Sequence, residues 1–146
     1  MTSVRIRVGA ICRDGDSILL VEHEKNHERY WLFPGGGIKV DETAEDALAR
    51  EVLEETSVKV SVGRPVCICE SISPNHDRHI VHFLYETRRI SGSPGKSCDP
   101  RVRRSEFVPV SLMNGLTLYP PIQDWLAKRL SDGFADMPEY LGAMWV

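Results

Sequence analysis

The sequence predicts one layered domain of the α/β or α+β class, built from a mixed sheet and two helices. Three observations predict it: a length of 146 residues, an ordinary composition with 42% apolar and 27% charged residues, and short alternating segments interrupted by two helical patterns. A chain of this length buries roughly 68–70% of its unfolded surface, which is enough for a core. The sequence has no internal repeat and no obvious linker, so we expect a single domain over residues 1–146.

The chain opens with a predicted hairpin. Residues 4–13 alternate between apolar and polar side chains, Asp-Gly-Asp at 14–16 forms the turn, and residues 17–23 form the second strand. A helix is expected over about 43–56, with Thr43 as its N-cap. The remaining expected elements are strands at about 57–62, 66–72, 79–89 and 105–110, and a second helix at about 120–131 with Pro121 near its first turn.

The charge pattern excludes several classes of protein. The net charge is −3, from 18 Lys+Arg against 21 Asp+Glu, which argues against a general nucleic-acid or membrane binder. No apolar run approaches the roughly 18–20 residues that cross a bilayer, and Arg5 and Arg7 interrupt any signal-peptide core. The four cysteines lack zinc-site spacing and are expected to be free thiols. We therefore expect a cytoplasmic protein with no membrane association and no stable nucleic-acid partner.

Three glutamates, Glu51, Glu54 and Glu55, lie within the last turns of the first predicted helix. At 100° per residue, Glu51 and Glu55 project into the same stripe as Ala44 and Leu48, which should pack inward. Burying an uncompensated carboxylate is costly, and no basic residue of this helix has the spacing to pair with Glu51. A hard divalent ion is the cation that best suits an oxygen-only cluster. The alternative is a solvated helix end without a ligand.

A glycine-rich loop directly precedes this helix, in the sequence "FPGGGIKVDE" at 33–42. Glycines let the backbone approach a bulky group and expose N–H donors to anions, and a helix N-terminus adds a partial positive charge. A tight turn without a ligand is the alternative interpretation. Together with the carboxylates, the loop indicates a site for a metal-bound phosphate compound.

Residues 36–58, "GGIKVDETAEDALAREVLEETSV", resemble the Nudix box, which reads G-x5-E-x7-R-E-U-x-E-E-x-G-U with U aliphatic. Ser57 stands where the family has glycine, at the position that ends the helix, so we expect an altered turn with little effect on chemistry. The resemblance implies the Nudix fold, a mixed β-sheet sandwiched between helices. The eight matching positions are Gly36, Glu42, Arg50, Glu51, Val52, Glu54, Glu55 and Val58.

The resemblance also implies a reaction. Family members hydrolyse a nucleoside diphosphate linked to a group X into a nucleoside monophosphate and phosphate-X, or release pyrophosphate from a triphosphate. The implied cofactor is Mg²⁺, with Mn²⁺ as a substitute, held by Glu51, Glu54 and Glu55. Glu106, before the last strand, matches the region that often supplies a further acid, although a solvated strand-edge glutamate is an equal alternative.

Catalytic and binding roles follow from the same resemblance. Glu54 is the first choice for the general base, Glu51 shares the catalytic role, and Arg50 orients a catalytic glutamate through a charge-assisted hydrogen bond. Gly36 and Gly37 would let the backbone approach the pyrophosphate. In addition, Glu42 would brace the loop or contact the metal.

The substrate is less well specified by the sequence. Pro74 stands sixteen residues after Val58, which is similar to the pattern in Nudix enzymes that act on ADP-ribose, and nearby His76 is a candidate substrate contact. An ADP-ribose-type substrate is therefore favoured. The alternatives are oxidised or ordinary nucleoside triphosphates, dinucleoside polyphosphates and nucleotide sugars. Tyr30 is one of several aromatic residues that would stack on a base, but such residues are more often part of the core.

Two questions stay open at the level of the sequence. A Nudix-shaped module that senses a nucleotide without cleaving it belongs to a different class, but such modules tend to lose the glutamates that are present here. The apolar tail within residues 132–146 is expected to dock either on the body of the domain or on a second subunit, and the second arrangement would make a homodimer.

Overall fold

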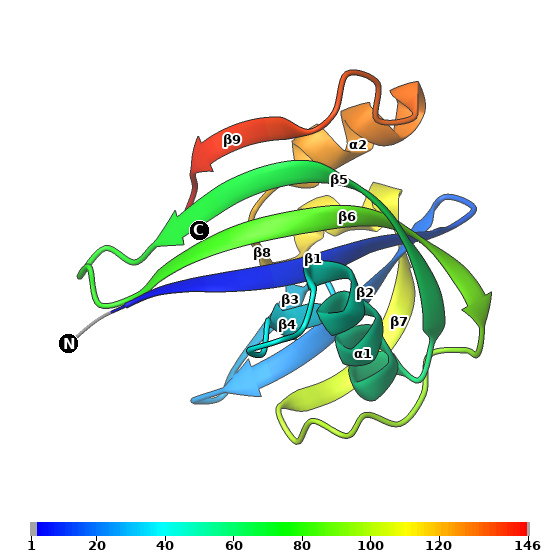
Figure 1. The fold of residues 1–146 in the computed structure, drawn as a ribbon, viewed down its shortest axis with the longest axis horizontal. Coiled ribbons are helices and arrows are strands. Elements are labelled where there is room, and N and C mark those ends of the chain that lie inside the picture. Colours follow the sequence, from blue (N-terminus) through cyan, green and yellow to red (C-terminus); the bar gives the residue numbers. More distant parts are fainter. Residues whose placement is uncertain (1–2, 146) are drawn as a thin grey trace.

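The computed structural model describes residues 3–145. The described chain forms a nine-stranded sheet and three helical segments (Figure 1). The strands are β1 (Val4–Asp14), β2 (Ser17–Lys25), β3 (Glu28–Leu32), β4 (Gly35–Gly37), β5 (Lys59–Ile72), β6 (His79–Ser91), β7 (Val102–Pro109), β8 (Leu118–Tyr119) and β9 (Glu139–Ala143). The helical segments are α1 (Ala44–Thr56), the 3₁₀ segment η1 (Val110–Gly115) and α2 (Gln123–Asp132).

The sheet is mixed, as predicted. Its strand order is β8-β3-β2-β1-β6-β5-β9, with β4 paired to β1 and β7 paired to β2. Strand β1 runs parallel to β6 and antiparallel to β4 along its first part, and pairs with β2 only at Arg13 and Asp14. The sheet therefore divides along β1 into two halves, and the short glycine strand β4 lies at this division.

The two α-helices pack on opposite faces of the sheet. Alternate residues of β1, namely Val8, Ala10 and Cys12, join a buried cluster with Leu48 and Val52 of α1. The opposite face forms a second buried cluster with residues of α2, and its members include Ile11, Leu20, Leu84, Leu126 and Leu130. This arrangement confirms the predicted fold, a mixed sheet between helices.

Strand β5 corrects one prediction. The strands expected at 57–62 and 66–72 form a single long strand, with register shifts between Val62 and Pro65 and between Pro65 and Cys67. The Gly-Arg-Pro sequence at 63–65 therefore forms an irregularity within a strand rather than a turn, as is common for Gly and Pro in strands.

The C-terminal region differs from the prediction in two details. Helix α2 starts at Gln123 after Ile122, later than the expected start at about 120, and Pro121 lies just before its first turn. The tail contains an unpredicted strand, β9, which pairs in parallel with β5 and lies along the outer edge of the sheet (Figure 1). Met137, Leu141 and Met144 pack against the buried cluster on the α2 side. The tail thus docks on the body of its own chain.

The cysteines agree with the prediction of free thiols. Cys12, Cys67 and Cys69 are buried, Cys98 is exposed, and all four carry free thiols. Among the helices of residues 3–145, none has the length and apolar character needed to cross a membrane.

Candidate active site

Helix α1 positions the three glutamates, and its two ends are fixed by local contacts. The side chain of Thr43 accepts a hydrogen bond from the Asp46 N–H at 3.1 Å, which confirms the predicted N-cap. At the other end Ser57 adopts the left-handed conformation with φ 64°, and its hydroxyl donates to the Lys96 carbonyl at 2.6 Å. Buried Leu48 and Val52 then fix the rotation of the helix, so that Glu51 and Glu55 point inward.

The glycine strand β4 lies between β1 and the inward-facing carboxylates. Gly35, Gly36 and Gly37 pair with residues 7–9 of β1. A Cβ at Gly35 would lie 1.9 Å from the Val8 carbonyl oxygen, so the close strand pairing requires glycine there. A Cβ at Gly36 would lie 2.6–2.8 Å from the carboxylate of Glu51. The second glycine therefore makes room for a glutamate of the site.

Glu55 connects the helix to this strand. The residue is only 2% exposed, and its Oε1 accepts a hydrogen bond from the Gly35 N–H at 2.7 Å. Its Oε2 lies 3.7 Å from Nε2 of His23, which is too long for a hydrogen bond. One oxygen of Glu55 is thus held by the backbone, and within residues 3–145 the other has no hydrogen-bond donor at normal distance.

Arg50 connects the other acidic residues. Its Nε and Nη2 donate to the two carboxylate oxygens of Glu42 at 2.7 and 3.0 Å, and Nη1 donates to Glu51 at 3.0 Å and to Glu54 at 3.3 Å. The prediction that no basic residue of the helix pairs with Glu51 is therefore wrong. It considered only spacings of three and four, whereas Arg50 contacts its immediate neighbour in the sequence.

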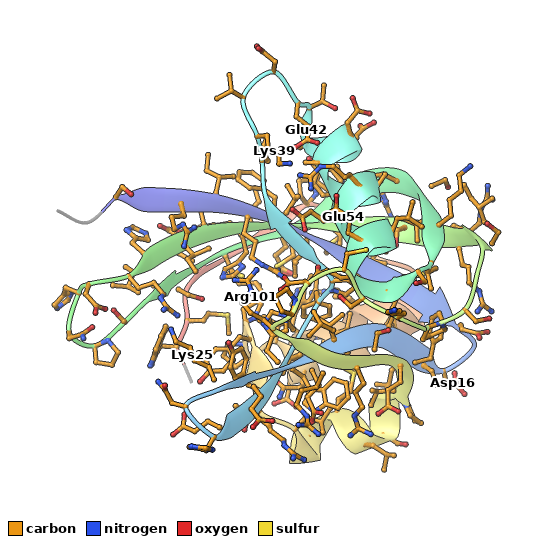
Figure 2. The ribbon with its side chains drawn as sticks, turned by 90° about the horizontal axis from the view of Figure 1, so that it is seen from below. Asp16, Lys25, Lys39, Glu42, Glu54 and Arg101 are labelled. Atoms are coloured by element: carbon orange, nitrogen blue, oxygen red, sulfur yellow. The ribbon has the colours of Figure 1, made fainter. Side chains whose placement is uncertain are left out.

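Glu42 braces the loop, one of the two roles expected for it. Its Oε1 accepts a hydrogen bond from the Lys39 N–H at 3.1 Å in addition to the bond from Arg50. The Arg50 hydrogen bond, aided by the Lys39 N–H, lowers the pKa of Glu42 to about 2. Figure 2 shows Glu42 and Lys39 together where the loop enters α1, with Glu54 further along the helix. The loop is therefore held to the helix by a permanent ion pair.

The electrostatics of Glu51 differ from those of Glu42. Burial raises the pKa of Glu51, hydrogen bonding from Arg50 opposes this, and the charges of Glu55 and Glu54 raise it further. The site thus concentrates negative charge that Arg50 only partly offsets. A bound cation would favour the ionised form of Glu51.

The residues present fit a hard divalent cation. The candidate ligands are carboxylate oxygens on one helix face, the donor type that Mg²⁺ prefers, and Gly36 leaves the space that the Glu51 carboxylate occupies. Within residues 3–145, however, no group of three acidic, histidine or cysteine side chains is close enough to hold a metal ion as they stand. Arg50 holds Glu51 and Glu54, and Gly35 holds Glu55, so metal binding requires these side chains to rearrange.

Comparison with known proteins identifies the family. The sequence model of the NUDIX domain matches residues 3–130. This chain belongs to the Nudix family. Among solved structures it is similar to a Nudix hydrolase from Nitrosomonas europaea, with a TM-score of 0.79 and 19% identity over 94% of this chain and 93% of the other. It is also similar to an ADP-ribose pyrophosphatase from Streptococcus suis, with a TM-score of 0.70 and 23% identity over 95% and 98%.

Curated relatives match a shorter region. Diphosphoinositol polyphosphate phosphohydrolase 3-alpha of Mus musculus is 40% identical over 75 residues, which is 51% of this chain and 45% of that protein. A MutT-like protein of Streptomyces ambofaciens is 31% identical over 84 residues, which is 58% of this chain and 51% of that protein. The chain thus spans about half the length of these relatives.

Outside the Nudix box, the structure does not bring Glu106 to the other glutamates. Glu106 is exposed on β7 and pairs with Leu20 of β2. Leu20 and Val108 belong to the buried cluster on the α2 side, whereas Phe107 packs against the cluster on the α1 side. By strand alternation Glu106 faces away from α1. This position favours the alternative given for Glu106, a solvated strand-edge glutamate, and its role as a metal ligand stays a prediction.

Pro74 and His76 also lie apart from the Nudix box. Both belong to the turn between β5 and β6, where the His76 N–H donates to the Ser73 carbonyl. Pro74 lines an open pocket of about 430 Å³, whereas His76 is exposed and does not line it. The residues lining this pocket are Ser73, Pro74, Asn75, Asp77, Arg78 and Trp145.

A row of aromatic rings leads from the Nudix glutamates towards this pocket. His23, beside Glu55, lies 5.6 Å from the ring of Tyr30, Tyr30 lies 5.4 Å from Tyr119, and Tyr119 lies 6.0 Å from Trp145. Sequence reasoning considered Tyr30 only as one candidate and missed the others. These residues come from four separate segments, so no local motif could have found the row.

Proposed function

We propose that this chain is a metal-dependent Nudix hydrolase that cleaves a nucleoside diphosphate linked to a group X into a nucleoside monophosphate and phosphate-X. The observation that carries the proposal is the fit between Gly36 and Glu51, which positions a carboxylate of α1 against the glycine strand. We also propose a cytoplasmic location, because free thiols suit a reducing compartment.

The roles of the residues follow from their contacts. When bound, Mg²⁺ or Mn²⁺ would shield the diphosphate charge, polarise the attacked phosphorus and lower the pKa of a bound water. Glu51, Glu54 and Glu55 are the proposed ligands. Glu54, with 46% of its side chain exposed, has the freedom to accept the proton of the attacking water. Arg50 orients Glu51 and Glu54, and it retains Glu42 as a partner when these two turn to a metal.

An ADP-ribose-type substrate remains the favoured proposal. Trp145 is 40% exposed at the end of the aromatic row and borders the pocket that contains Pro74. Exposed aromatic rings suit stacking with a nucleobase, and Asn75 and Asp77 supply polar groups at the same pocket. A nucleoside diphosphate extended along the row would place its base at Trp145 and its phosphates near the glutamates. Pro74 would act as a wall of the base site, and His76 as a peripheral contact.

A second candidate is a diphosphoinositol polyphosphate. The 40% identity over 75 residues to the mouse enzyme favours it, as does the presence of Arg7 and Arg101 close enough to Glu55 for their charges to interact. Such a substrate carries many anionic groups and no base. Oxidised nucleoside triphosphates and dinucleoside polyphosphates form a third set of candidates, which the sequence leaves open.

The test is identification of products by chromatography. Purified protein with Mg²⁺ is incubated separately with ADP-ribose, oxidised dGTP, a dinucleoside tetraphosphate, UDP-glucose and a diphosphoinositol polyphosphate. We expect AMP and ribose phosphate from ADP-ribose at the highest rate, and loss of this activity in Glu54→Gln and Glu55→Gln. Faster release of pyrophosphate from oxidised dGTP, or of phosphate from the inositol compound, would replace the favoured substrate.

The same panel tests the enzyme class. A nucleotide-sensing module would bind one of these compounds without turnover in either Mg²⁺ or Mn²⁺. Tight binding of a ligand that stays intact, in protein whose folding is verified by its unfolding transition, would contradict the hydrolase proposal.

A further inference from the structure

Three basic side chains near the division of the sheet each keep a buried nitrogen without a hydrogen-bond partner among the described residues. These atoms are Nη1 of Arg7, Nε2 of His23 and Nδ1 of His82, and we refer to the three residues as the basic cluster. A buried polar group without a partner destabilises the fold, and more so when it is charged. Three such groups in one region require an explanation.

Arg7 is the charged member of the basic cluster. It lies on β1 between two neighbours, Gly37 on β4 and His82 on β6. Its Nη2 donates to the Phe33 carbonyl at 2.9 Å, whereas Nη1 is buried without a partner. Among residues 3–145, no carboxylate oxygen lies within 4.0 Å of this guanidinium. Arg7 is half-buried overall, and a guanidinium with one buried nitrogen left unpaired is a poor structural element.

Arg7 nevertheless lies close to the glutamates. The charges of Glu55 and Glu51 partly offset the lowering of the Arg7 pKa by burial, and Tyr30 acts in the same direction. The guanidinium is therefore near enough to interact with the two acids electrostatically, yet too far to pair with either. A group that contacts both the guanidinium and the two acids would therefore have to enter between them.

The two histidines extend the same region. His82 is 3% exposed, its Nε2 is hydrogen-bonded to the Ser71 hydroxyl at 3.0 Å, and burial beside Arg7 lowers its pKa to about 4, so the ring is neutral near pH 7. His23 is 6% exposed, and its ring packs against Tyr30 in a tilted arrangement with an interplanar angle of 59°. Its Nε2 lies 3.7 Å from Glu55. Each histidine can thus offer one ring nitrogen to a ligand without breaking a bond that it already makes.

We propose that the basic cluster binds phosphate oxygens of the substrate from the side opposite to the glutamates. An Arg guanidinium matches the oxygens of a phosphate with two parallel hydrogen bonds, and it is weakly hydrated enough to remain buried between turnovers. A diphosphate presents oxygens on more than one side, so a metal on the glutamates and Arg7 opposite them would contact different oxygens. This inference rests on the proposed function, because it assumes that the substrate contains a phosphoanhydride.

The competing explanation is that Arg7 only braces the Phe33 carbonyl. The two explanations predict different effects of removing Arg7 on the stability of the ligand-free protein. A brace stabilises the protein without any ligand, so its removal lowers the unfolding temperature. A half-buried cation with an unpaired buried nitrogen destabilises the free protein, so its removal leaves the unfolding temperature unchanged or raises it.

The experiment measures binding of inorganic pyrophosphate by titration calorimetry, in Mg²⁺, to the full chain and three variants. Arg7→Gln is expected to weaken pyrophosphate binding at least tenfold and to keep or raise the unfolding temperature without ligand. Arg7→Lys, which keeps the charge but not the planar fork, is expected to lose affinity several-fold. Arg5→Gln is the matched control on the same strand, since Arg5 is exposed, and it is expected to bind like the parent chain.

The proposal is overturned if both Arg7 variants bind pyrophosphate as tightly as the parent chain, or if the parent chain does not bind pyrophosphate. It is also overturned if Arg7→Gln loses affinity but has a lower unfolding temperature than the parent chain, because the loss would then reflect a weakened fold. Should Arg7→Gln not fold, unchanged affinity in Arg7→Lys overturns the proposal and a several-fold loss supports it. The measurement needs no turnover. Pyrophosphate binding that depends on Arg7, in a chain that cleaves nothing, would reject the hydrolase function and retain the anion site.

Discussion

The carboxylate of Glu51 occupies the space in which any side chain at residue 36 would begin. A Cβ on Gly36 would lie 2.6 Å from Cδ of Glu51 and 2.7 and 2.8 Å from its two oxygens. Because Arg50 also holds Oε1 of Glu51 at 3.0 Å, the carboxylate cannot move aside without losing an ion pair. Gly36 and Glu51 thus form a fitted contact between the glycine strand and α1.

Gly36→Ala should reduce activity far more than stability. The added methyl would displace the Glu51 carboxylate, and a misplacement of about 1 Å near the reacting groups can cost about 100-fold in rate. We expect kcat to fall by about that factor on the best substrate of the panel. Gly115→Ala is the matched control, since nothing lies within 4 Å of a Cβ at this residue of η1. Equal activity in the two variants would show that the contact does not matter to the reaction.

Glu51→Gln should stabilise the protein while removing activity. Burial is the largest cause of the raised pKa of Glu51, so the fold disfavours the ionised carboxylate. A group with a raised folded-state pKa stabilises the fold below its unfolded pKa of about 4.3, and this contribution is lost as pH rises through the folded pKa. The variant should therefore gain stability relative to the parent chain between pH 4 and pH 7.

Urea unfolding at pH 4 and pH 7 in metal-free buffer measures this difference, and kcat should fall at least about 100-fold because a ligand of the metal is lost. Glu54→Gln is the control, because 46% of the Glu54 side chain is exposed. We expect Glu54→Gln to lose activity without the pH-dependent gain in the free energy of unfolding. A Glu51→Gln variant that is less stable than the parent chain at pH 7 would contradict the account of Glu51.

Ser57 offers a test of the position at which this Nudix box departs from the family. Its left-handed backbone, with φ 64°, favours glycine, but its hydroxyl donates to the Lys96 carbonyl. Ser57→Gly should change the free energy of unfolding by less than about 1 kcal/mol, because relief of backbone strain offsets the lost hydrogen bond. Ser57→Ala keeps the strain and loses the bond, so it should destabilise by about 1 kcal/mol. Denaturant unfolding of both variants measures the difference, and neither change should alter kcat.

The parts of the site that the sequence predicted are local. The N-cap Thr43, the extent of α1 and the inward direction of Glu51 and Glu55 all follow from helix periodicity, and the structure agrees. The Arg50–Glu51 pair was missed although it is local, since periodicity does not describe the path of a long flexible side chain. Helix periodicity therefore predicted the face on which each side chain lies, but not which charged side chains pair with one another.

The parts that escaped prediction depend on strand pairing over long distances in the sequence. Strand β9 pairs with β5 about seventy residues earlier, as at Cys67 and Glu139, and no local signal fixes that register. The face on which Glu106 lies was not predicted, because a shift of one residue reverses the face of a strand. The basic cluster unites β1, β2 and β6, so Arg7 and His82 became neighbours only once the sheet was assembled.

Trp145→Ala tests whether the aromatic row selects a nucleobase. Stacking on an aromatic ring is worth about 1–3 kcal/mol per base, so KM for ADP-ribose should rise roughly tenfold. The glutamates lie at the other end of the row, so kcat should change little. The measurement is a KM and kcat comparison for ADP-ribose and a diphosphoinositol polyphosphate, which has no base. Tyr140→Phe is the control, because exposed Tyr140 lies on β9 and does not line the pocket.

The two substrates separate recognition of a base from a general effect on the fold. Removal of a stacking surface should leave KM for the inositol compound unchanged, because that compound is held only through its phosphates. An equal rise in KM for both substrates would mean that Trp145 supports the docked tail rather than the ligand, since its ring also packs 6.0 Å from Tyr119. An unchanged KM for ADP-ribose would place the base elsewhere and remove the main structural support for the favoured substrate.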